Sequence, residues 1–312
     1  MRILVADPLA DDGLALLRAH AHVDYAPGLD RAELLARLAA ADALIVRSGV
    51  RVDAAIIAAG HRLAVIGRAG TGLDNIDLDA AGAAGISVVN APAANTTAAA
   101  EHALALMFAL ARHVPEADAS LRAGEWRRAD FIGIELAGKT LGLVGLGRIG
   151  LTVAVRARAM EMTLLAADPF VTAEAAVGHA IRMVSLAELL AAADVVSVHV
   201  PLSAATRGLI GADELALMKP TALLINTARG GLVDEAALAR ALVDGRLAGA
   251  GIDVYADEPL PPDSPLRSAP NTVLTPHLGA STAEAQVRAA VQTAEQVLAV
   301  LASRSTATAT PR

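Results

Sequence analysis

The sequence has no cysteine, few aromatic residues and almost no lysine. Of its 312 residues none is Cys, 2% are Phe, Tyr or Trp, and the only lysines are Lys139 and Lys219. The lack of cysteine excludes disulfides, thiolate metal ligands and a cysteine nucleophile. Because aromatic residues are rare and 54% of the residues are apolar, the cores must be aliphatic. We expect a globular protein of a reducing compartment, the cytoplasm, without a metal site.

A long apolar run and a basic surface are also missing. Acidic residues outnumber basic ones by 33 to 26, and this excess is unfavourable for nonspecific binding to nucleic acid. The first apolar run stops at Asp7, too early for a signal peptide. The most apolar helical segment, 97–113, contains Glu101 and His102, and no run approaches the roughly 18 residues of a membrane span. We therefore expect no nucleic acid and no membrane as partners.

Short apolar runs alternate with alanine-rich segments of helical length. The expected strands are 3–6, 43–46, 63–66, 86–89, 141–144, 163–167, 195–200, 222–225 and 272–274. The expected helices include 30–39, 97–113, 149–159, 186–193, 234–242 and 283–301. Apolar strands that alternate with helices indicate parallel sheets covered on both faces, so the predicted fold class is α/β. At about 100–200 residues per domain, the length predicts two domains.

A glycine-rich motif, Gly145-Leu146-Gly147-Arg148-Ile149-Gly150, follows the expected strand 141–144 and opens a helix. The next expected strand ends at Asp168, 18 residues past Gly150. In a dinucleotide site of this kind the pyrophosphate lies at the helix N-terminus and the acid binds the ribose hydroxyls. A carboxylate at this place disfavours the 2′-phosphate of NADP, so we predict NAD as the cofactor.

A second phosphate-binding pattern overlaps this region. Residues 133–140 match the P-loop pattern by letter. A P-loop follows a strand and opens a helix, whereas Lys139 and Thr140 lead into an expected strand. We therefore predict no ATP site at this match.

Three polar residues suited to acid–base chemistry follow expected strands. His277 comes just after 272–274, Arg229 lies in Asn226–Gly231, and Glu258 lies in a further loop. Ligands of open α/β sheets bind at such loops. His277 could act as a base, Glu258 could orient its imidazole, and Arg229 could bind a carboxylate. A lone histidine is more often structural, and the spacing alone leaves open whether the three meet.

Several motifs resemble the D-isomer-specific 2-hydroxyacid dehydrogenase family. The resemblance covers about residues 1–302, in the motifs Val46-Arg47-Ser48, Gly67–Asn75, Asn90-Ala91-Pro92 with Asn95, Gly124–Arg128, Gly145–Gly150, Asn226–Asp234, Asp253–Pro259 and Pro276–Ser281. Several of these are similar to the branch that acts on 3-phosphoglycerate. The resemblance implies NAD-dependent oxidation of D-3-phosphoglycerate to 3-phosphohydroxypyruvate, the first step of serine biosynthesis, by hydride transfer from C2.

The resemblance also implies roles for individual residues. His277 matches the acid–base, Glu258 its partner, and Arg229 the clamp for the carboxylate and carbonyl. The implied cofactor contacts are Thr71, Gly145, Gly147, Arg148, Ile149, Gly150, Asp168, Thr227, Ala228, Asp253, Gly279 and Ala280. The implied contacts of the small anionic 2-hydroxy acid are Arg47, Ser48, Gly70, Asn95, Arg128 and Arg229. Arg128 matches an arginine that reaches the substrate across a dimer interface, so we expect a homodimer or homotetramer. Arg51 is expected either to add charge near the phosphate or to be an ordinary surface residue.

The resemblance implies two Rossmann-like or flavodoxin-like domains, with the active site in the cleft between them. Residues 1–92 and 281–312 would form a discontinuous substrate domain, and residues 93–280 the NAD-binding domain. The tail 303–312 is expected to be disordered. Longer relatives carry C-terminal modules that bind serine, and we expect no such module and no serine feedback here.

The sequence departs from the family pattern at two further places. Glu161 stands where relatives usually have glycine, so we expect a local change of the turn. Ala129 and Asp130 stand where relatives often carry lysine, so the basic patch around Arg128 is thinner.

Three alternatives remain. A glyoxylate/hydroxypyruvate reductase would share the fold and the three catalytic residues, with less need for Arg47 and Arg128. A formate dehydrogenase is disfavoured because it carries glutamine where this chain has Glu258. An NAD-sensing corepressor could share the fold but would bind a partner without useful turnover, and the phosphoglycerate-branch motifs argue against it.

Overall fold

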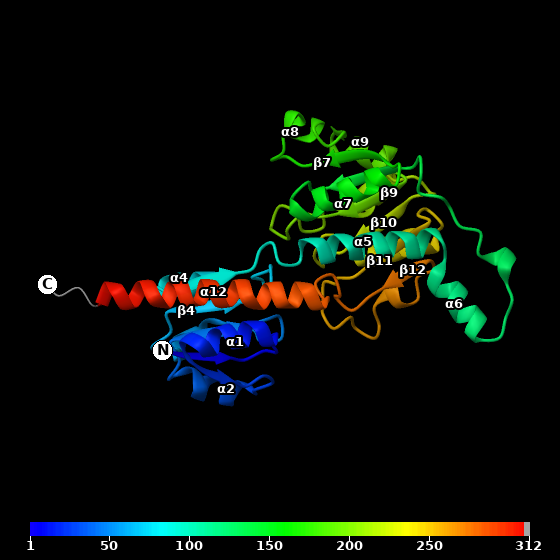
Figure 1. The fold of residues 1–312 in the computed structure, drawn as a ribbon. Helices are drawn as coiled ribbons and strands as arrows, with labels where there is room; N and C mark the ends of the chain where they lie inside the picture. The colour runs from blue at the N-terminus through cyan, green and yellow to red at the C-terminus, as the bar shows by residue number, and fades with distance from the viewer. Residues whose placement is uncertain (309–312) are drawn as a thin grey trace. The chain divides into compact units, whose positions relative to one another are not determined.

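The computed structural model describes residues 1–308, without the side chains of residues 175, 177 and 305–308, and it divides the chain into two compact units (Figure 1). Unit 1 comprises Met1–Asn95 and Ala280–Arg312, and unit 2 comprises Thr96–Gly279. Each unit has one parallel sheet with helices on both faces, which confirms the predicted α/β class. Within residues 1–308 no helix combines the length and apolarity that crossing a membrane requires.

Unit 1 is built on a five-stranded sheet in the order β2-β1-β3-β4-β5. Its strands are β1 (Arg2–Val5), β2 (His22–Tyr25), β3 (Ala43–Val46), β4 (Val65–Arg68) and β5 (Ser87–Asn90). Every residue of β3 is buried, as expected for a strand between two helical layers. The order is the flavodoxin-like one, in which the direction of winding reverses between β1 and β3.

Two layers of helices cover the sheet of unit 1. One layer holds α1 (Asp11–His20) and α12 (Ala283–Thr308), and the other holds α2 (Arg31–Leu38), α3 (Ala54–Ala59) and α4 (Leu78–Ala83). Small residues allow α12 to approach closely. A Cβ on Gly13 of α1 would lie 2.7 Å from the Cβ of Ala290, and a Cβ on Gly67 of β4 would lie 2.6 Å from Val297 Cγ2. The last helix is therefore part of the core of unit 1.

The chain passes between the units after Asn95 and after Gly279. The expected boundaries were 92/93 and 280/281. Ala94 packs with Ala289 of α12, and Arg288 Nε donates to the Ala94 carbonyl at 2.9 Å, so residues 93–95 belong with α12. This helix continues to Thr308, so the expectation of a disordered tail from 303 is wrong up to that residue. The remainder of the tail lies outside the described residues.

Unit 2 is built on a seven-stranded parallel sheet in the order β12-β11-β10-β9-β6-β7-β8. Its strands are β6 (Thr140–Val144), β7 (Thr163–Ala167), β8 (Ile181–Met183), β9 (Val195–Val198), β10 (Leu223–Asn226), β11 (Gly249–Ile252) and β12 (Thr272–Leu274). Lys139 and Thr140 lead into β6 and not into a helix, which agrees with the rejection of the P-loop.

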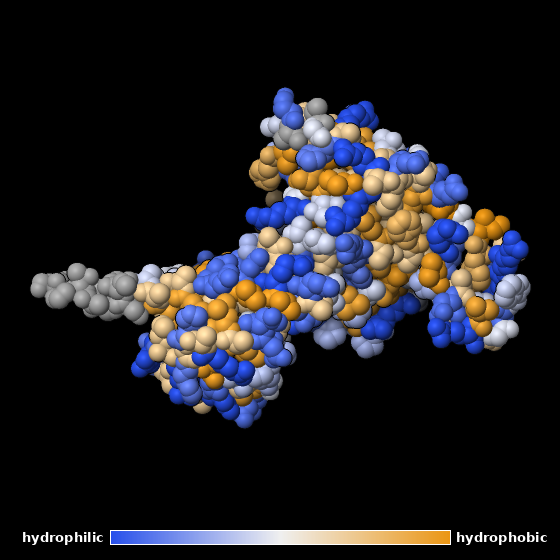
Figure 2. Space-filling model, in the orientation of Figure 1, coloured by the Kyte–Doolittle hydropathy of each residue, from blue (hydrophilic) through white to orange (hydrophobic). Residues whose placement is uncertain are grey.

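Helices cover both faces of this sheet as well. One face carries α5 (Thr96–Ala111), α7 (Arg148–Ala159) and α8 (Ala173–Val177), and the other carries α9 (Leu186–Ala192), α10 (Ala212–Leu217), α11 (Glu235–Val243) and the short η2 (Pro265–Arg267). By contrast, α6 (Val114–Arg122) and the short η1 (Arg128–Asp130) extend away from the rest of unit 2 (Figure 1). In Figure 2 this extension carries apolar surface among its polar residues.

Candidate active site

The carboxyl ends of the strands of unit 2 form one edge of the sheet, and the predicted catalytic residues follow them. The strands β6, β7, β9, β10, β11 and β12 lead respectively into Gly145, Asp168, His199, Thr227, Asp253 and Thr275. The strand order reverses between β6 and β9, and ligands of open α/β sheets bind at this point of the carboxyl edge. One parallel sheet therefore brings residues from 145 to 277 to a common edge.

The glycine loop joins β6 to α7, and its three glycines differ in surroundings. Gly145 has φ +95°, and a Cβ there would lie 2.9 Å from the His199 carbonyl carbon. A Cβ on Gly150 would collide with the Gly145 carbonyl, so both positions require glycine for packing within the protein. Gly147 is the N-cap of α7, and a Cβ there would meet no atom of the described residues within 4 Å. The space over Gly147 is therefore open to a ligand.

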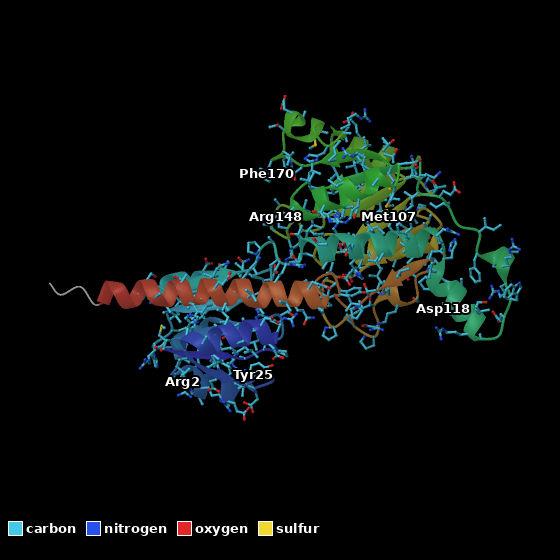
Figure 3. All side chains as sticks on the ribbon, viewed as in Figure 1. Arg2, Tyr25, Met107, Asp118, Arg148 and Phe170 are labelled. Carbon is cyan, nitrogen blue, oxygen red and sulfur yellow. The ribbon has the colours of Figure 1, made fainter. Side chains whose placement is uncertain are left out.

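Two features of the carboxyl edge fit a dinucleotide. Gly147 has no side chain that could accept a hydrogen bond from the first N–H groups of α7, so these groups are suited to an anion. Thr227 is 8% exposed, and its Oγ1 has no hydrogen-bond partner among the described residues. Buried hydroxyls normally have a partner, so this one is suited to a bound polar group. Figure 3 labels Arg148, the first residue of α7 and a predicted cofactor contact.

Asp168 bends back toward the glycine loop. Its Oδ2 accepts the Leu146 N–H and its Oδ1 accepts the Phe170 N–H, both at 2.9 Å. These bonds fix the carboxylate, and each oxygen can accept a further hydrogen bond from a ribose hydroxyl.

His199 follows β9 and lies beside the glycine loop, a position that the sequence prediction missed. Its N–H donates to the Val144 carbonyl at 2.7 Å, and its Nε2 lies 2.9 Å from Ser197 Oγ. Burial lowers the pKa of His199 to about 4. The imidazole is therefore neutral at physiological pH and adds no charge where the phosphates are expected.

His277 and Glu258 form a hydrogen-bonded pair, with Nδ1 of the imidazole 2.8 Å from Glu258 Oε2. Burial would raise the pKa of the Glu258 carboxyl, but hydrogen bonds from His277 and the Tyr255 N–H hold it below its usual value. The carboxylate accepts from Nδ1–H, so Nε2 keeps its lone pair for an incoming proton. The two side chains are 45% and 38% exposed, which leaves the pair accessible to a substrate.

Arg229 lies in a turn that Asn226 holds. The Asn226 amide donates to the Arg229 carbonyl at 3.0 Å and accepts the Ala228 N–H at 3.1 Å. The guanidinium donates from Nη1 to the Ala228 carbonyl at 2.7 Å. The next residue, Gly230, lies directly against the backbone of Tyr255. The loops that carry Arg229 and Glu258 are thus in contact.

Two further side chains hold the loop of Glu258. The Tyr255 hydroxyl lies 3.1 Å from the Ile252 carbonyl and 3.0 Å from the Thr275 carbonyl, so it joins the loops after β11 and β12. Glu235 Oε1 accepts the Ala256 N–H at 2.6 Å. Burial, aided by the neighbouring carboxylates, raises the pKa of Glu235.

The predicted substrate residues of unit 1 also follow strands of their sheet. Arg47 and Ser48 come directly after β3. Asp7, which is 7% exposed, accepts the Arg47 N–H at 2.6 Å and the Val50 N–H at 3.2 Å. From the other side the Asn75 amide donates to the Arg47 and Val50 carbonyls at 2.7 and 2.6 Å. The backbone of the loop is therefore fixed independently of any ligand.

A second loop of unit 1 holds predicted contacts with both ligands. Gly70 and Thr71 follow β4. Thr71 Oγ1 donates to Asn95 Oδ1 at 2.7 Å, and the Asn90 amide donates to the Thr71 carbonyl at 2.6 Å. Thr71 and Asn95, 24 residues apart, thus meet in the structure.

The remaining predicted residues lie outside these two groups. Arg51 is exposed in the loop after β3. Arg128 is exposed in η1, which precedes β6 and is not one of the loops that follow the strands at the carboxyl edge. Ala280 falls in unit 1 and Gly279 in unit 2.

Residues 104–279 match the NAD-binding domain of the D-isomer-specific 2-hydroxyacid dehydrogenases. The chain belongs to this family. The D-3-phosphoglycerate dehydrogenase of Mycobacterium tuberculosis is 51% identical over 300 residues, which are 96% of this chain and 57% of that protein. The TT0316 protein of Thermus thermophilus is similar in structure with a TM-score of 0.90 at 41% identity, over 97% of both chains. A glyoxylate reductase from Paecilomyes thermophila has a TM-score of 0.85 at 34% identity, over 95% of this chain and 94% of that one.

The matched domain identifies NAD as the cofactor of this family member, as the glycine loop and Asp168 predict. The chain spans about half the length of the curated relatives that it matches.

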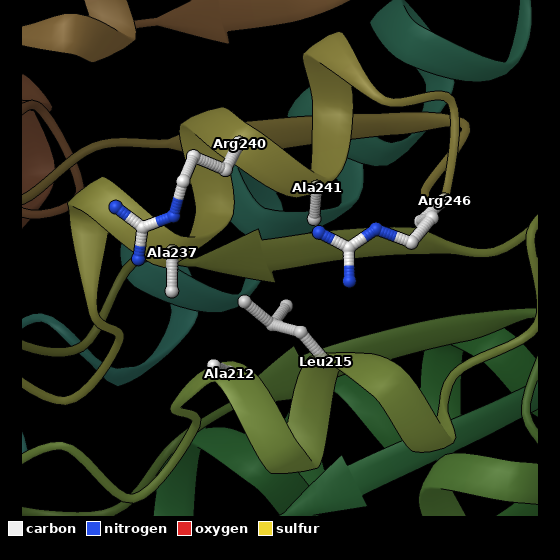
Figure 4. A pocket seen from close by; sticks show the side chains of 6 residues that line it. All are labelled: Ala212, Leu215, Ala237, Arg240, Ala241 and Arg246. Carbon is white, nitrogen blue, oxygen red and sulfur yellow. The ribbon is translucent and has the colours of Figure 1, made fainter.

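A shallow depression elsewhere on unit 2 contains none of these residues. It lies between α10 and α11 and is lined by Ala212, Leu215, Ala237, Arg240, Ala241 and Arg246 (Figure 4). Arg246 is already paired with Asp244 at 2.9 Å. None of the predicted site residues is among these lining residues.

Proposed function

We propose that this chain catalyses the NAD-dependent oxidation of D-3-phosphoglycerate at C2 to 3-phosphohydroxypyruvate, the first step of serine biosynthesis. The observation that carries the proposal is the His277–Glu258 pair at 2.8 Å on the same sheet edge as the glycine loop. The choice of substrate is supported by relatives named D-3-phosphoglycerate dehydrogenase, at 47–51% identity over 96% of the chain. Its cysteine-free composition fits the cytoplasm as its location.

The proposed chemistry removes a proton and a hydride from the C2 alcohol. NAD, when bound, accepts the hydride. His277 Nε2 takes the hydroxyl proton, and the Glu258 carboxylate stabilises the imidazolium that forms. Arg229 binds the substrate carboxylate and, in the reverse reaction, polarises the keto group.

We propose Arg47, Ser48, Gly70, Asn95 and Arg128 as further substrate contacts. The first four lie in loops that hydrogen bonds already hold in place, so little ordering is needed on binding. A charged phosphate gains most from arginine, because its planar fork binds phosphate in a bidentate manner.

The chain also carries an apolar surface suited to a second copy of itself. Six large apolar side chains are exposed on residues 108–134, namely Phe108, Val114, Leu121, Trp126, Ile132 and Ile134. They lie on the end of α5 and on the extension that contains α6 and η1, and Trp126 is 83% exposed. Large exposed apolar side chains that gather on one segment are typical of an interface. We propose a homodimer through this extension, with Arg128 reaching the substrate of the other subunit.

An assay panel tests the substrate. It compares 3-phosphoglycerate, 2-hydroxyglutarate, D-lactate and D-glycerate, each with NAD and NADP, through the absorbance of the reduced cofactor. We expect the highest kcat/KM for 3-phosphoglycerate with NAD, and we expect Arg47→Ala to raise KM for 3-phosphoglycerate more than for D-glycerate. A preference for unphosphorylated acids would favour the glyoxylate/hydroxypyruvate reductase alternative. NAD binding without turnover of any acid would favour the corepressor.

Mixing two inactive variants tests the dimer. In a hybrid of Arg128→Ala and His277→Ala chains, the subunit with intact His277 receives the intact Arg128 from its partner. We expect the refolded mixture to recover activity that neither variant has alone. Sedimentation as a monomer in the wild type, or no recovery in the mixture, would contradict the proposal.

A further inference from the structure

The loop that carries His277 rests on a hydrogen-bonded cluster of three side chains from three elements, of which Asp253 is fully buried. Asp253 follows β11 and is 0% exposed, Thr275 follows β12, and His102 lies on α5. Thr275 Oγ1 donates to Asp253 Oδ1 at 2.6 Å, and His102 Nε2 lies 3.1 Å from Asp253 Oδ1 and 3.0 Å from Thr275 Oγ1. His102 is 151 residues from Asp253 in sequence.

The hydrogen bonds assign the proton of His102. The Thr275 hydroxyl has one proton and donates it to Asp253. The approach of His102 Nε2 to the same hydroxyl oxygen therefore requires a proton on Nε2, which is shared between Thr275 Oγ1 and Asp253 Oδ1. His102 is thus a donor to this cluster, whatever the state of its Nδ1.

Asp253 accepts hydrogen bonds from three consecutive N–H groups of the catalytic loop. Its carbonyl accepts the His277 N–H at 2.8 Å, Oδ1 accepts the Leu278 N–H at 2.7 Å, and Oδ2 accepts the Gly279 N–H at 2.8 Å. Burial would raise the pKa of Asp253, but the hydrogen bonds from His102, Thr275 and the loop lower it. The carboxylate therefore stays ionised although it is closed off from solvent.

This support is needed because the loop holds His277 in an unfavourable conformation. His277 has φ +56°, in the left-handed region that is unfavourable for a residue with a Cβ. The conformation aims the imidazole at Glu258, 2.8 Å away. A shift of the Asp253 carboxylate would release the Leu278 and Gly279 N–H groups together.

We propose that His102 is a positioning residue for the acid–base His277. It acts through Asp253 and Thr275: its Nε2–H holds the buried carboxylate in the one orientation that binds the N–H groups of the loop. The proposal rests on the proposed function for its effect on turnover, whereas its effect on the loop is independent of any substrate.

Four variants test the proposal. His102→Leu removes the donor and His102→Gln keeps an amide donor. Thr275→Val and Thr275→Ser form a second matched pair that changes less volume. As a control, His61→Leu repeats the first change at an exposed position of unit 1. Each variant is examined for kcat and KM and for amide hydrogen exchange of the peptide that covers residues 275–280.

We expect His102→Leu and Thr275→Val to lower kcat by about 10- to 100-fold with little change in KM for the acid, because the base is misplaced while the substrate contacts remain. Amide exchange at 277–279 should become faster in both. His102→Gln and Thr275→Ser should recover most of kcat and of the protection, and His61→Leu should resemble the wild type.

Wild-type exchange and kcat in both His102→Leu and Thr275→Val would overturn the proposal. The proposal would also be overturned if neither His102→Gln nor Thr275→Ser recovered kcat and the protection from exchange. The hydrogen-bond donors at these two positions would then not be responsible for the effect. If the wild type oxidises no 2-hydroxy acid but the exchange differences are seen, the proposed function fails and the positioning role stands.

Discussion

The backbone of Gly230 lies so close to the carbonyl of Tyr255 that no side chain fits at position 230. A Cβ there would collide with the Tyr255 carbonyl group and with the Ala256 nitrogen. The contact joins the loop of Arg229 to the loop of Glu258. The spacing of Arg229 and Glu258, two of the three groups proposed for the chemistry, therefore depends on glycine at position 230.

Gly230→Ala should separate these loops. The obstacle is backbone, which cannot rotate away as a flexible side chain can, so we expect a loss of about 3 kcal/mol in the free energy of unfolding. We also expect a lower kcat, because Arg229 moves relative to the His277–Glu258 pair. Urea unfolding and steady-state kinetics measure both.

Gly82→Ala is the matched control for this change. Gly82 lies inside α4, and a Cβ there meets nothing within 4 Å. Alanine in a helix should raise the free energy of unfolding by about 0.5–1 kcal/mol. Equal effects of the two substitutions would contradict the role given to the Gly230–Tyr255 contact.

Gly147→Ala should separate cofactor binding from folding. A Cβ at this N-cap meets no protein atom within 4 Å, so the free energy of unfolding should change by no more than about 0.5 kcal/mol. The methyl group would occupy the space proposed for the pyrophosphate, and we expect NAD to bind at least about tenfold more weakly. Titration calorimetry measures the affinity, and an unchanged Kd would place the dinucleotide elsewhere.

His277→Ala should remove the base without unfolding the protein, since the side chain is 45% exposed. We expect kcat to fall by about 10²- to 10⁴-fold, the usual contribution of a positioned acid–base group. His61→Ala, at an exposed position of unit 1, should leave kcat unchanged. Near-wild-type turnover by His277→Ala would remove this residue from the mechanism.

Residues that come directly after apolar strands could be predicted from the sequence, and residues that support those loops from elsewhere could not. Gly145, Asp168, Arg229 and His277 could be named because parallel strands bring their carboxyl ends together. The contact of His102 with Asp253 was missed, because the two residues lie 151 positions apart and no local pattern marks it.

The missed strands have physical reasons of their own. β11 has the sequence GAGI, which lacks the run of large apolar residues that marks a strand. Its glycines are needed because α5 packs directly on it: a Cβ on Gly251 would lie 3.0 Å from Leu106 Cβ. β2 and β8 are edge strands with exposed residues, so they lack the continuous apolar run of a central strand.

Glu161→Gly should stabilise the protein. Glu161 lies between α7 and β7 with φ +62°, in the left-handed region, and its carbonyl accepts the Gly138 N–H at 3.0 Å. Glycine adopts this conformation without the steric cost, so we expect a gain of about 1 kcal/mol in the free energy of unfolding. Glu161→Ala removes the same charge but keeps a Cβ, and it should give no gain. A gain of equal size in both variants would show that charge, not backbone conformation, limits stability here.

His199 should make the stability of the protein depend on pH between about 6.5 and 4. Its pKa is lowered to about 4 by burial, whereas an unfolded histidine titrates near 6.5. Between these values the unfolded chain binds more protons than the folded one, so stability is complete above about pH 6.5 and falls as the pH is lowered. The loss in the free energy of unfolding at pH 4 should reach up to about 3 kcal/mol.

His199→Gln removes the titrating group. Its free energy of unfolding should change less than that of the wild type from pH 6.5 to 5, above the range in which most carboxylates titrate. His61→Gln, at an exposed position, should keep the wild-type slope. Parallel pH profiles for the wild type and His199→Gln would mean that the imidazole is solvated. The conclusion that burial keeps His199 neutral at physiological pH would then be wrong.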